Sequence, residues 1–481
     1  MLNPQPIRPT IHLDVLRSEQ LDAIQRATLD VLEHVGVCFP SESALTVFTE
    51  HGADVDRQSQ IVRLSPELVI EALGQAPRSY ALGGRAEEMD LCLDGAACHL
   101  ATDGCGVETL DFETGERRSS CKNDVAKMAR VADALSSISF YWPMVSAQDY
   151  GKTAPLHELD ASFNNTVKHV QTETVMGERP AQYAVRMGEV IAGSKKAMRQ
   201  RPPFSVLICT IAPLAQDKEG IEAGMVYAEA GVPVGFMAMP NMGATAPATP
   251  GGALVIGNAE VVSAMVLMQL VAPGAPVFHS ILASVMDPHT AEYMVSIPQK
   301  YLCNAAAVQL AHAWGVPTLA GAFGMDAKKP GTWQHGRDNV YTSLLVPLAG
   351  ADLITGSGLL EASTLLVPEQ IVLDDEVWHT NRVLLDGMDT DSGSLALDVI
   401  FDVGPKGHFL AHDHTRTHLR DIWIPDLTHP RPSPIGRPAG GLRQRARAEL
   451  NRILADHRPE PLSEVVRGEL ASILEAAERE L

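Results

Sequence analysis

The stretch NAEVVSAMVLMQLVAPGAPVFHS, residues 258–280, decides the fold class of this chain. Its first half is a long apolar run without Gly or Pro, which predicts a buried helix rather than a strand. The Pro-Gly pair at 273–274 then ends the helix, because Pro has no amide donor and Gly tolerates the turn. The Val-Phe pair at 277–278 predicts a short buried strand that ends at His279. The stretch is therefore one helix–strand unit.

The same unit recurs along the chain downstream of residue 121. Helical segments alternate with short apolar runs at intervals of roughly 30–45 residues. We expect eight strands, within residues 137–149, 168–177, 203–214, 232–241, 277–280, 316–325, 351–360 and 398–405. This count and the chain length predict an α/β fold of the closed (β/α)8 TIM barrel type. An open dinucleotide-binding sheet is disfavoured because no G-x-G-x-x-G follows an early strand.

The barrel pattern leaves two flanking regions, so we predict three parts. Residues 1–120 form an N-terminal helical and β-hairpin extension, residues 121–420 form the barrel catalytic domain, and residues 421–481 form a C-terminal helical tail. Asp-Gly and Thr-Gly pairs break residues 89–120 into short pieces typical of hairpins. The amphipathic tail is expected either to pack on the flank of the barrel or to hold a partner subunit, which makes a homo-oligomer one expectation.

Composition excludes several classes of partner. The 38 basic and 59 acidic residues give a net charge of −21, which argues against nucleic acid and anionic membranes. The apolar runs fall short of the roughly 20 residues that span a bilayer, and the start has no signal-peptide core. The seven cysteines are odd in number and include no C-x-x-C pair. Reduced thiols in a cytoplasmic protein are therefore expected, rather than disulfides or a zinc site.

Candidate site residues are those at the C-terminal ends of the strands, where TIM barrels carry their chemistry. Most residues at such positions pack or contact solvent, so each is a candidate only. The candidates are Tyr141, Trp142, Gln148, Gln171, Glu173, Cys209, Asn241, His279, Ser280, Phe323, Thr355 and Ser357.

Two further segments carry aromatic or titratable residues. The glycine-rich loop 321–339 contains Trp333 and Arg337 and is expected either to lie over the mouth of the barrel as a lid or to be fixed to its rim. The segment GHFLAHDHTRTH holds four histidines, the cluster His408–His418. It is expected to be a polar surface loop, with a metal site as the less favoured alternative.

Five segments resemble the trimethylamine methyltransferase family, in particular its branch without pyrrolysine, which includes glycine betaine methyltransferases. They are residues 103–135, 257–280, 323–339, 350–378 and 404–415, which contain DGCGVETLDFETGERRSS, GADLITGSGLLEASTLLVPEQ and GPKGHFLAHDHT. The resemblance covers nearly the whole chain in order. It implies a (β/α)8 barrel with an N-terminal extension, and the transfer of a methyl group from a methylated amine to the cobalt of a separate corrinoid protein.

The resemblance also narrows the expected substrate. The trimethylamine enzymes of the family carry pyrrolysine in the barrel, whereas this chain has only standard residues. A quaternary amine, such as glycine betaine, is therefore the expected methyl donor. Its leaving group departs as a neutral tertiary amine, so the protein needs only to position one N–methyl bond before Co(I). No cofactor is expected to be bound tightly by this chain, and no metal is assigned to it.

Residue roles follow from strand-end position and residue type. We expect Trp142, Phe323 and Tyr141 to face the trimethylammonium group, with Trp333 as a further binding residue. Glu173 and His279 are the candidate catalytic residues, and Arg337 is the candidate clamp for a substrate carboxylate. Two alternatives remain: a metal-dependent lyase or hydrolase that uses the His408–His418 cluster, and a barrel that binds betaine without catalysing its reaction.

Overall fold

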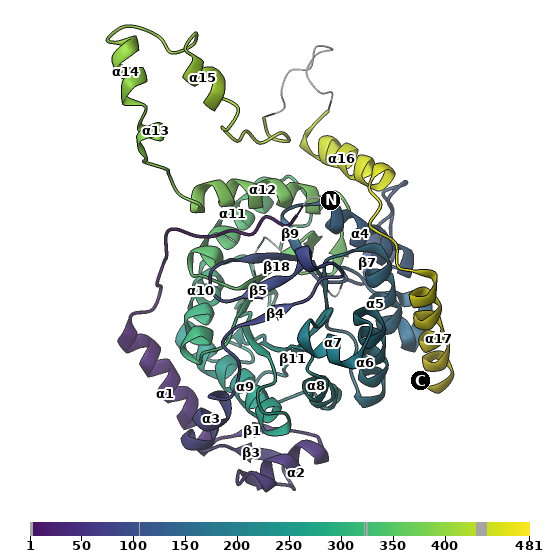
Figure 1. The fold of residues 1–481 in the computed structure, drawn as a ribbon. Coiled ribbons are helices and arrows are strands. Elements are labelled where there is room, and N and C mark those ends of the chain that lie inside the picture. Colours follow the sequence, from purple (N-terminus) through teal and green to yellow (C-terminus); the bar gives the residue numbers. More distant parts are fainter. Residues whose placement is uncertain (1–2, 105, 322, 324–325, 430–439) are drawn as a thin grey trace.

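The barrel consists of eight parallel strands that follow the order of the chain around one sheet (Figure 1). The computed structural model describes residues 3–104, 106–321, 323, 326–429 and 440–481. A bridge between His279 and Thr318 joins the two outermost strands and closes the sheet. The strands are β6 (His99–Thr102), β9 (Ile138–Tyr141), β10 (His169–Thr172), β11 (Phe204–Cys209), β12 (Val234–Ala238), β14 (Val277–Ile281), β17 (Leu319–Gly321) and β18 (Leu353–Ser357). The predicted (β/α)8 TIM barrel is confirmed.

A helix follows each barrel strand and packs on the outside of the sheet. These helices are α4 (Lys122–Ala134), α5 (Ala154–Asn165), α6 (Glu178–Ala192), α8 (Lys218–Ala230), α9 (Pro250–Val271), α10 (Pro298–Ala313), α11 (Trp333–Leu348) and α12 (Gln370–Leu385). The 3-10 helix η2 (Gln148–Thr153) precedes α5, and α7 (Lys195–Gln200) follows α6. Each crossover returns the chain to the next parallel strand, as this topology requires.

Helix α9, the first half of the stretch that decides the fold, is apolar on all sides because it is buried on all sides. It packs against β12 and β14 on one side and against α1, α3 and α8 on the others. By length and composition alone this helix is long and apolar enough to span a membrane, but 78% of its apolar window is buried inside the protein. Burial in the core accounts for the apolar sequence.

The first and last strands were predicted incorrectly. Residues 99–102 were placed among the hairpins of the extension, yet β6 pairs in parallel with both β9 and β18. The apolar run at 398–405 was predicted to be a strand, but it contains the exposed helix α14 (Leu397–Val403). Strand pairing depends on neighbours distant in sequence, which a local pattern does not reveal. The barrel thus runs from β6 to α12, across the predicted boundary at residue 120.

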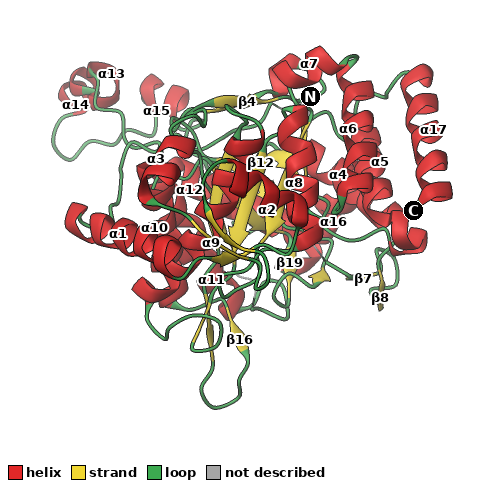
Figure 2. Ribbon diagram, turned by 90° about the horizontal axis from the view of Figure 1, so that it is seen from below, coloured by secondary structure: helices red, strands yellow, loops and turns green. Residues whose placement is uncertain are grey.

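A hairpin closes the N-terminal end of the barrel. Strands β4 (Tyr80–Leu82) and β5 (Leu91–Leu93) pair in antiparallel fashion, and the 3-10 helix η1 (Glu87–Met89) lies between them. Their leucines belong to one buried cluster with inward-facing barrel residues such as Phe140, Leu207 and Phe278. Figure 2 shows β4 at one end of the barrel and β16 (Tyr293–Met294) at the other. The interior is therefore packed at one end only.

The N-terminal helices cover the flank of the barrel near α9. They are α1 (Ser18–His34), α2 (Glu42–Glu50) and α3 (Pro66–Leu73), joined by the small sheet of β1 (Val37–Cys38), β2 (Asp54–Asp56) and β3 (Ile61–Arg63). Ser41 and Ser65 cap α2 and α3.

The C-terminal helices pack on the flank of the barrel, which confirms the first of the two expectations for the tail. Helix α16 (Leu442–Asp456) lies against α4 and α12, and α17 (Glu464–Glu480) lies against α5 and α6. Between α12 and α16, the short helices α13 (Ser392–Leu395), α14 and α15 (Asp413–His418) project away from the barrel (Figure 1).

Candidate active site

A cavity of about 280 Å³ lies among the C-terminal ends of the barrel strands. Its volume is close to the lower limit of about 300 Å³ that is usual for small-molecule sites. Strands β6, β9, β10, β12, β14, β17 and β18 each contribute a residue at or just past their C-terminal end. Its lining consists of Asp103, Gly104, Trp142, Glu173, Met237, Met239, Leu282, Tyr293, Val295, Gly321, Thr355, Gly356, Ala362, Ser363 and Thr364.

The rim of the cavity reaches the protein surface through two apolar side chains. Met239 is 37% exposed and Tyr293 is 43% exposed, and both line the cavity. Tyr293 comes from β16, which pairs with β15 (Ser284–Met286) beside β13 (Asn241–Met242) to form a small sheet over this end of the barrel. A ligand therefore has an apolar route between the cavity and the outside.

Trp142 forms an aromatic wall of the cavity. Its backbone N–H donates to Thr102 Oγ1 at 2.9 Å, and the same hydroxyl donates to the Trp142 carbonyl at 2.6 Å. The indole lies so close to Gly104 that a Cβ there would come within 2.1 Å of the ring. Only glycine fits at that position. The bonds to β6 and the close backbone therefore hold the ring, which is 4% exposed, in one place.

Asp103 follows β6 directly and carries one of two carboxylates in the lining. It accepts hydrogen bonds from Ser363 Oγ at 2.5 Å and from the Gly104 N–H at 3.0 Å. Burial raises the pKa of Asp103 to about 6, and the charge of Glu173 acts in the same direction. These hydrogen bonds and the charge of Lys300 oppose the rise. Asp103 is thus an anion at neutral pH that loses its charge in mildly acidic solution.

Glu173 carries the second carboxylate and lies just past the end of β10. It accepts a hydrogen bond from Cys209 Sγ at 2.9 Å. Burial, and then the charge of Glu173, raise the pKa of the Cys209 thiol well above its usual range. The thiol therefore remains protonated, and it orients the carboxylate rather than acting as a nucleophile.

A strained loop covers the cavity between the short strands β19 (Leu359–Leu360) and β20 (Leu365–Leu366). Glu361, Ala362 and Ser363 have φ angles of 54°, 54° and 65°, a left-handed conformation that non-glycine residues avoid. Such residues cost roughly 1–3 kcal/mol each and persist only where their surroundings hold them. Arg117 helps to stabilise this loop conformation, because it pairs with Glu361 at 2.9 Å and also with Glu108.

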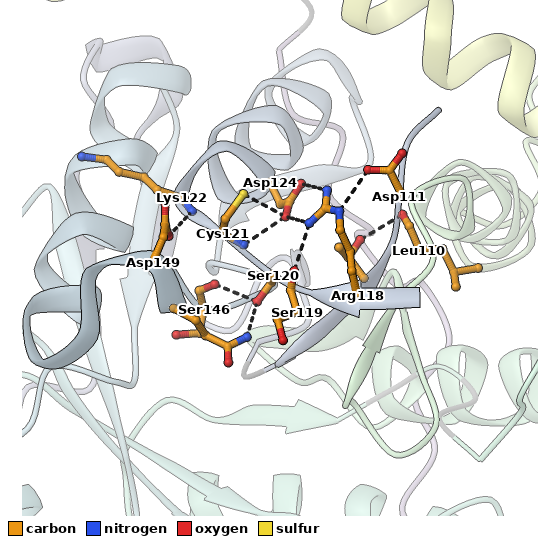
Figure 3. A network of polar contacts seen from close by, with 12 residues as sticks. Leu110, Asp111, Arg118, Ser119, Ser120, Cys121, Lys122, Asp124, Ser146 and Asp149 are labelled. Atoms are coloured by element: carbon orange, nitrogen blue, oxygen red, sulfur yellow. Dashed lines mark hydrogen bonds and ion pairs between the residues drawn. The ribbon is translucent and has the colours of Figure 1, made fainter. Parts of the chain in front are cut away.

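The hairpin of β7 (Glu108–Leu110) and β8 (Arg117–Ser119) pairs with β20 and is fixed to the barrel by a polar network (Figure 3). The Arg118 guanidinium contacts both carboxylate oxygens of Asp124 at 2.7 and 2.9 Å and also reaches Asp111. Burial alone would raise the pKa of Asp124, but these hydrogen bonds hold it below its usual value. Asp124 lies in the first turn of α4. The network therefore connects the β7–β8 hairpin, which pairs with β20 beside the loop over the cavity, to a helix of the barrel.

Of the candidate site residues, the structure brings Trp142, Glu173 and Thr355 to the cavity. Tyr141 does not face it: its side chain points to the outside of the barrel and donates to the Val125 carbonyl on α4 at 3.0 Å. The side chain of His279, on β14, also points outward, and its Nε2 contacts Asn258 Oδ1 on α9 at 2.9 Å. Burial lowers the pKa of His279 to about 3, so it is a neutral residue of the wall. The expected placement of Tyr141 and His279 at the mouth is therefore corrected.

The loop 321–339 is not the cover of the cavity. Phe323 is buried in the layer between strands and helices with Tyr141 and Met144. Trp333 is 86% exposed because it begins α11, which starts earlier than the sequence predicted. Arg337 lies on the same helix and pairs with Asp338 at 2.6 Å. None of these three side chains lines the cavity, and residues 322, 324 and 325 of the loop lie outside the described residues.

The sequence did not point to Asp103, Met237, Tyr293 or Ser363 as site residues. Asp103 would have been found had β6 been recognised, since it occupies the strand-end position of that strand. Tyr293 reaches the cavity from the short strand β16 and Ser363 from the loop between β19 and β20, and the course of both segments depends on the tertiary fold. Among the described residues, no three His, Cys, Asp or Glu side chains are placed to share a metal ion. The histidines at 412–418 lie on and just before the projecting α15, away from the mouth.

Sequence comparisons with known proteins indicate one family. The model of the family described as trimethylamine methyltransferase (MTTB) matches residues 1–481. The trimethylamine methyltransferase MttB of Desulfitobacterium hafniense is 34% identical over 96% of this chain and 93% of its own. The glycine betaine methyltransferase of Desulfitobacterium hafniense strain Y51 is 28% identical, with 96% of each chain covered. The crystal structure of the Methanosarcina barkeri monomethylamine methyltransferase aligns with a TM-score of 0.47 and 11% identity over 92% of this chain and 93% of its own.

Proposed function

This chain is a member of the trimethylamine methyltransferase family, and from that premise we propose that it moves a methyl group from a quaternary amine to the Co(I) of a separate corrinoid protein. Its relatives are named methyltransferases, so the chain is an enzyme of that class. The quaternary amine and the corrinoid acceptor are the proposed parts.

The observation that carries the proposal is the pairing of an aromatic wall with two carboxylates in one small cavity. The fixed indole of Trp142 lines the cavity, and a desolvated quaternary ammonium gains roughly 0.5–2 kcal/mol on an aromatic face. Asp103 and Glu173 line the same cavity, and their charges attract a cation. Met237 and Met239 add polarisable apolar surface for the methyl groups.

The chemistry that this cavity supports requires positioning rather than acid–base catalysis. One carbon–nitrogen bond breaks, its electron pair stays on the nitrogen, and the leaving group departs as a neutral tertiary amine. The methyl carbon forms its new bond with the electron pair of Co(I). No proton moves, so Glu173 acts on the charge of the substrate rather than as a general acid. Loss of the positive charge at nitrogen also weakens the hold of Asp103 and Glu173 on the product.

The corrinoid protein is the methyl acceptor, and we expect it to dock at the mouth of the barrel. The exposed side chains Ile211, Met239 and Tyr293 follow or overlie strand ends at this mouth. An apolar rim of this kind suits transient contact with a second protein. A cytoplasmic setting belongs to the same proposal, and it is supported by the free thiols of the six described cysteines.

The test of the proposed function is incubation of the purified protein with Co(I) cobalamin and a panel of methylated amines. The panel comprises tetramethylammonium, choline, glycine betaine and trimethylamine. We expect methyl–cobalt absorbance to grow with at least one quaternary amine, and not in the absence of the protein. Saturable binding of quaternary amines without any methyl–cobalt signal would instead identify a non-catalytic binding barrel. Absence of both signals would contradict the proposal.

A further inference from the structure

The charge of the cavity lining constrains the rest of the substrate beyond its ammonium group. The described lining contains two carboxylates, those of Asp103 and Glu173, and no Lys, Arg or His. A cation that enters the cavity therefore lowers its net negative charge. A zwitterion brings the same cation together with a third carboxylate, for which this lining offers no ionic partner.

The positively charged side chains near the cavity either form ion pairs with other residues or lie behind the cavity lining. Arg337 pairs with Asp338, and Arg117 pairs with Glu361 and Glu108. Lys300, on α10, is fully buried and its charge acts on Asp103, but it does not line the cavity. Its Nζ has no hydrogen-bond partner among the described residues, and from behind the lining its charge offsets part of the existing negative charge.

The hydroxyl groups of the lining present acceptors rather than donors. Thr355 donates its proton to the Thr102 carbonyl at 2.8 Å, and Thr364 donates to the Glu361 carbonyl at 2.7 Å. Ser363 donates to Asp103 at 2.5 Å. Each hydroxyl has one proton, so the protons of these three groups are already donated within the protein, and the Thr355 and Thr364 hydroxyls meet a ligand as acceptors. The Tyr293 hydroxyl at the rim is a neutral donor and does not cancel a carboxylate charge.

From this charge and hydrogen-bond pattern we propose that the cavity selects a quaternary ammonium whose other end is a neutral hydrogen-bond donor, such as a hydroxyl group, and discriminates against carboxylate-bearing betaines. The inference rests on the proposed function and specifies its substrate class. A substrate hydroxyl finds acceptors at Thr355 and Asp103. A substrate carboxylate in the same place is buried beside like charges without a cationic partner, which is among the costliest arrangements in a protein.

The test is isothermal titration of the full-length protein with three ligands that share one trimethylammonium group. The ligands are choline, glycine betaine and the methyl ester of glycine betaine, in which the carboxylate charge is removed. We expect choline to bind about tenfold or more tightly than glycine betaine, a difference of about 1.4 kcal/mol. The methyl ester should recover most of that difference, because it lacks the carboxylate charge and adds only one methyl group.

The variant Asp103→Asn sharpens the test, since it removes one lining charge and keeps an acceptor for Ser363. We expect it to reduce the preference for choline over glycine betaine by about fivefold to tenfold. Glu116→Gln removes one exposed charge from the turn between β7 and β8 and should leave the preference unchanged. Glycine betaine binding as tightly as choline would overturn the inference and leave the proposed function standing. If no trimethylammonium compound binds, both fail.

Discussion

The two ends of strand β10 place titratable side chains in different surroundings. One side chain is packed against protein, and the other borders a cavity. At the closed end, His169 contacts the Gly83 carbonyl at 3.0 Å and Ser205 Oγ at 2.9 Å, so both ring nitrogens are satisfied by protein. Burial lowers its pKa to about 4 and keeps it neutral. Four residues later, Glu173 borders a cavity. The inward-facing side chains of β10 are therefore packed against protein at one end of the strand and border the cavity at the other.

The surroundings of each end explain the difference. The closed end is filled by Leu82, Leu91 and Leu93 of the β4–β5 hairpin. At the other end, the loop 359–364 covers a space that no side chain fills. Residues at the closed end should therefore affect the free energy of unfolding, and residues at the mouth should affect ligand binding. Each prediction below tests that division.

The largest expected effect is on methyl transfer in Glu173→Gln. The amide is isosteric and still accepts a hydrogen bond from Cys209, so the fold is retained, but the attraction for the cation is lost. We expect the rate of methyl–cobalt formation to fall by about 10²–10³-fold, comparable to the loss of a preorganised electrostatic contact. The melting temperature should change little. Unchanged transfer by this variant would remove Glu173 from the site.

At the closed end, Leu91→Ala should show the reverse pattern. Truncation of this buried leucine leaves a void and should lower the free energy of unfolding by about 2–4 kcal/mol. Urea denaturation measures that loss. Methyl transfer per folded molecule should match the wild type, and a loss of transfer without a loss of stability would show that the two ends are not separate.

Trp142→Leu tests the aromatic wall while keeping an apolar side chain there. Loss of the cation–π contact should weaken choline binding by about 0.5–2 kcal/mol. Titration calorimetry gives the value. The uncharged analogue 3,3-dimethylbutanol serves as the ligand control, because its binding contains no cation–π component. An equal loss for both ligands would indicate that the indole contributes shape alone.

The smallest expected effect is a pH dependence of binding. The pKa of Asp103 is raised from 3.8 to about 6, so the carboxylate is charged above that value and neutral below it. Cation affinity should therefore fall as the pH drops through this value, by at most about tenfold per pH unit. In the ligand-free protein the sign is opposite: the folded state holds a proton longer than the unfolded chain, so this group lowers the stability as pH rises from 3.8 to about 6. Asp103→Asn should flatten both profiles.

The fold was predictable from the sequence because each helix–strand unit has a local signature. Helix α9 and strand β14 follow directly from an apolar run, a Pro-Gly turn and a second apolar run. Strand β6 was not predictable in the same way, since its four residues lie between turn signals and are recruited by partners far along the chain. Helix α14 shows the converse: an apolar run predicts a strand only if a neighbouring strand is available.

The candidate site was predictable only in part. Strand-end position identified Trp142, Glu173 and Thr355. Adjacent residues of a strand face opposite sides of the sheet, so Tyr141 faces α4 while Trp142 faces the cavity. Arg337 and Trp333 were assigned to a loop that continues as helix α11. Tyr293, on the short strand β16, and Ser363, on the loop between β19 and β20, line the cavity from segments that have no periodic signal in the sequence.

The most direct measurement is calorimetric titration of tetramethylammonium into the wild type, Glu173→Gln and Leu91→Ala. This ligand has no second functional group, so it reports only on the recognition of the ammonium. We expect one saturable site in the wild type and in Leu91→Ala, and affinity lower by about tenfold or more in Glu173→Gln. Equal affinity in all three proteins would contradict the assignment of the binding site to the mouth of the barrel.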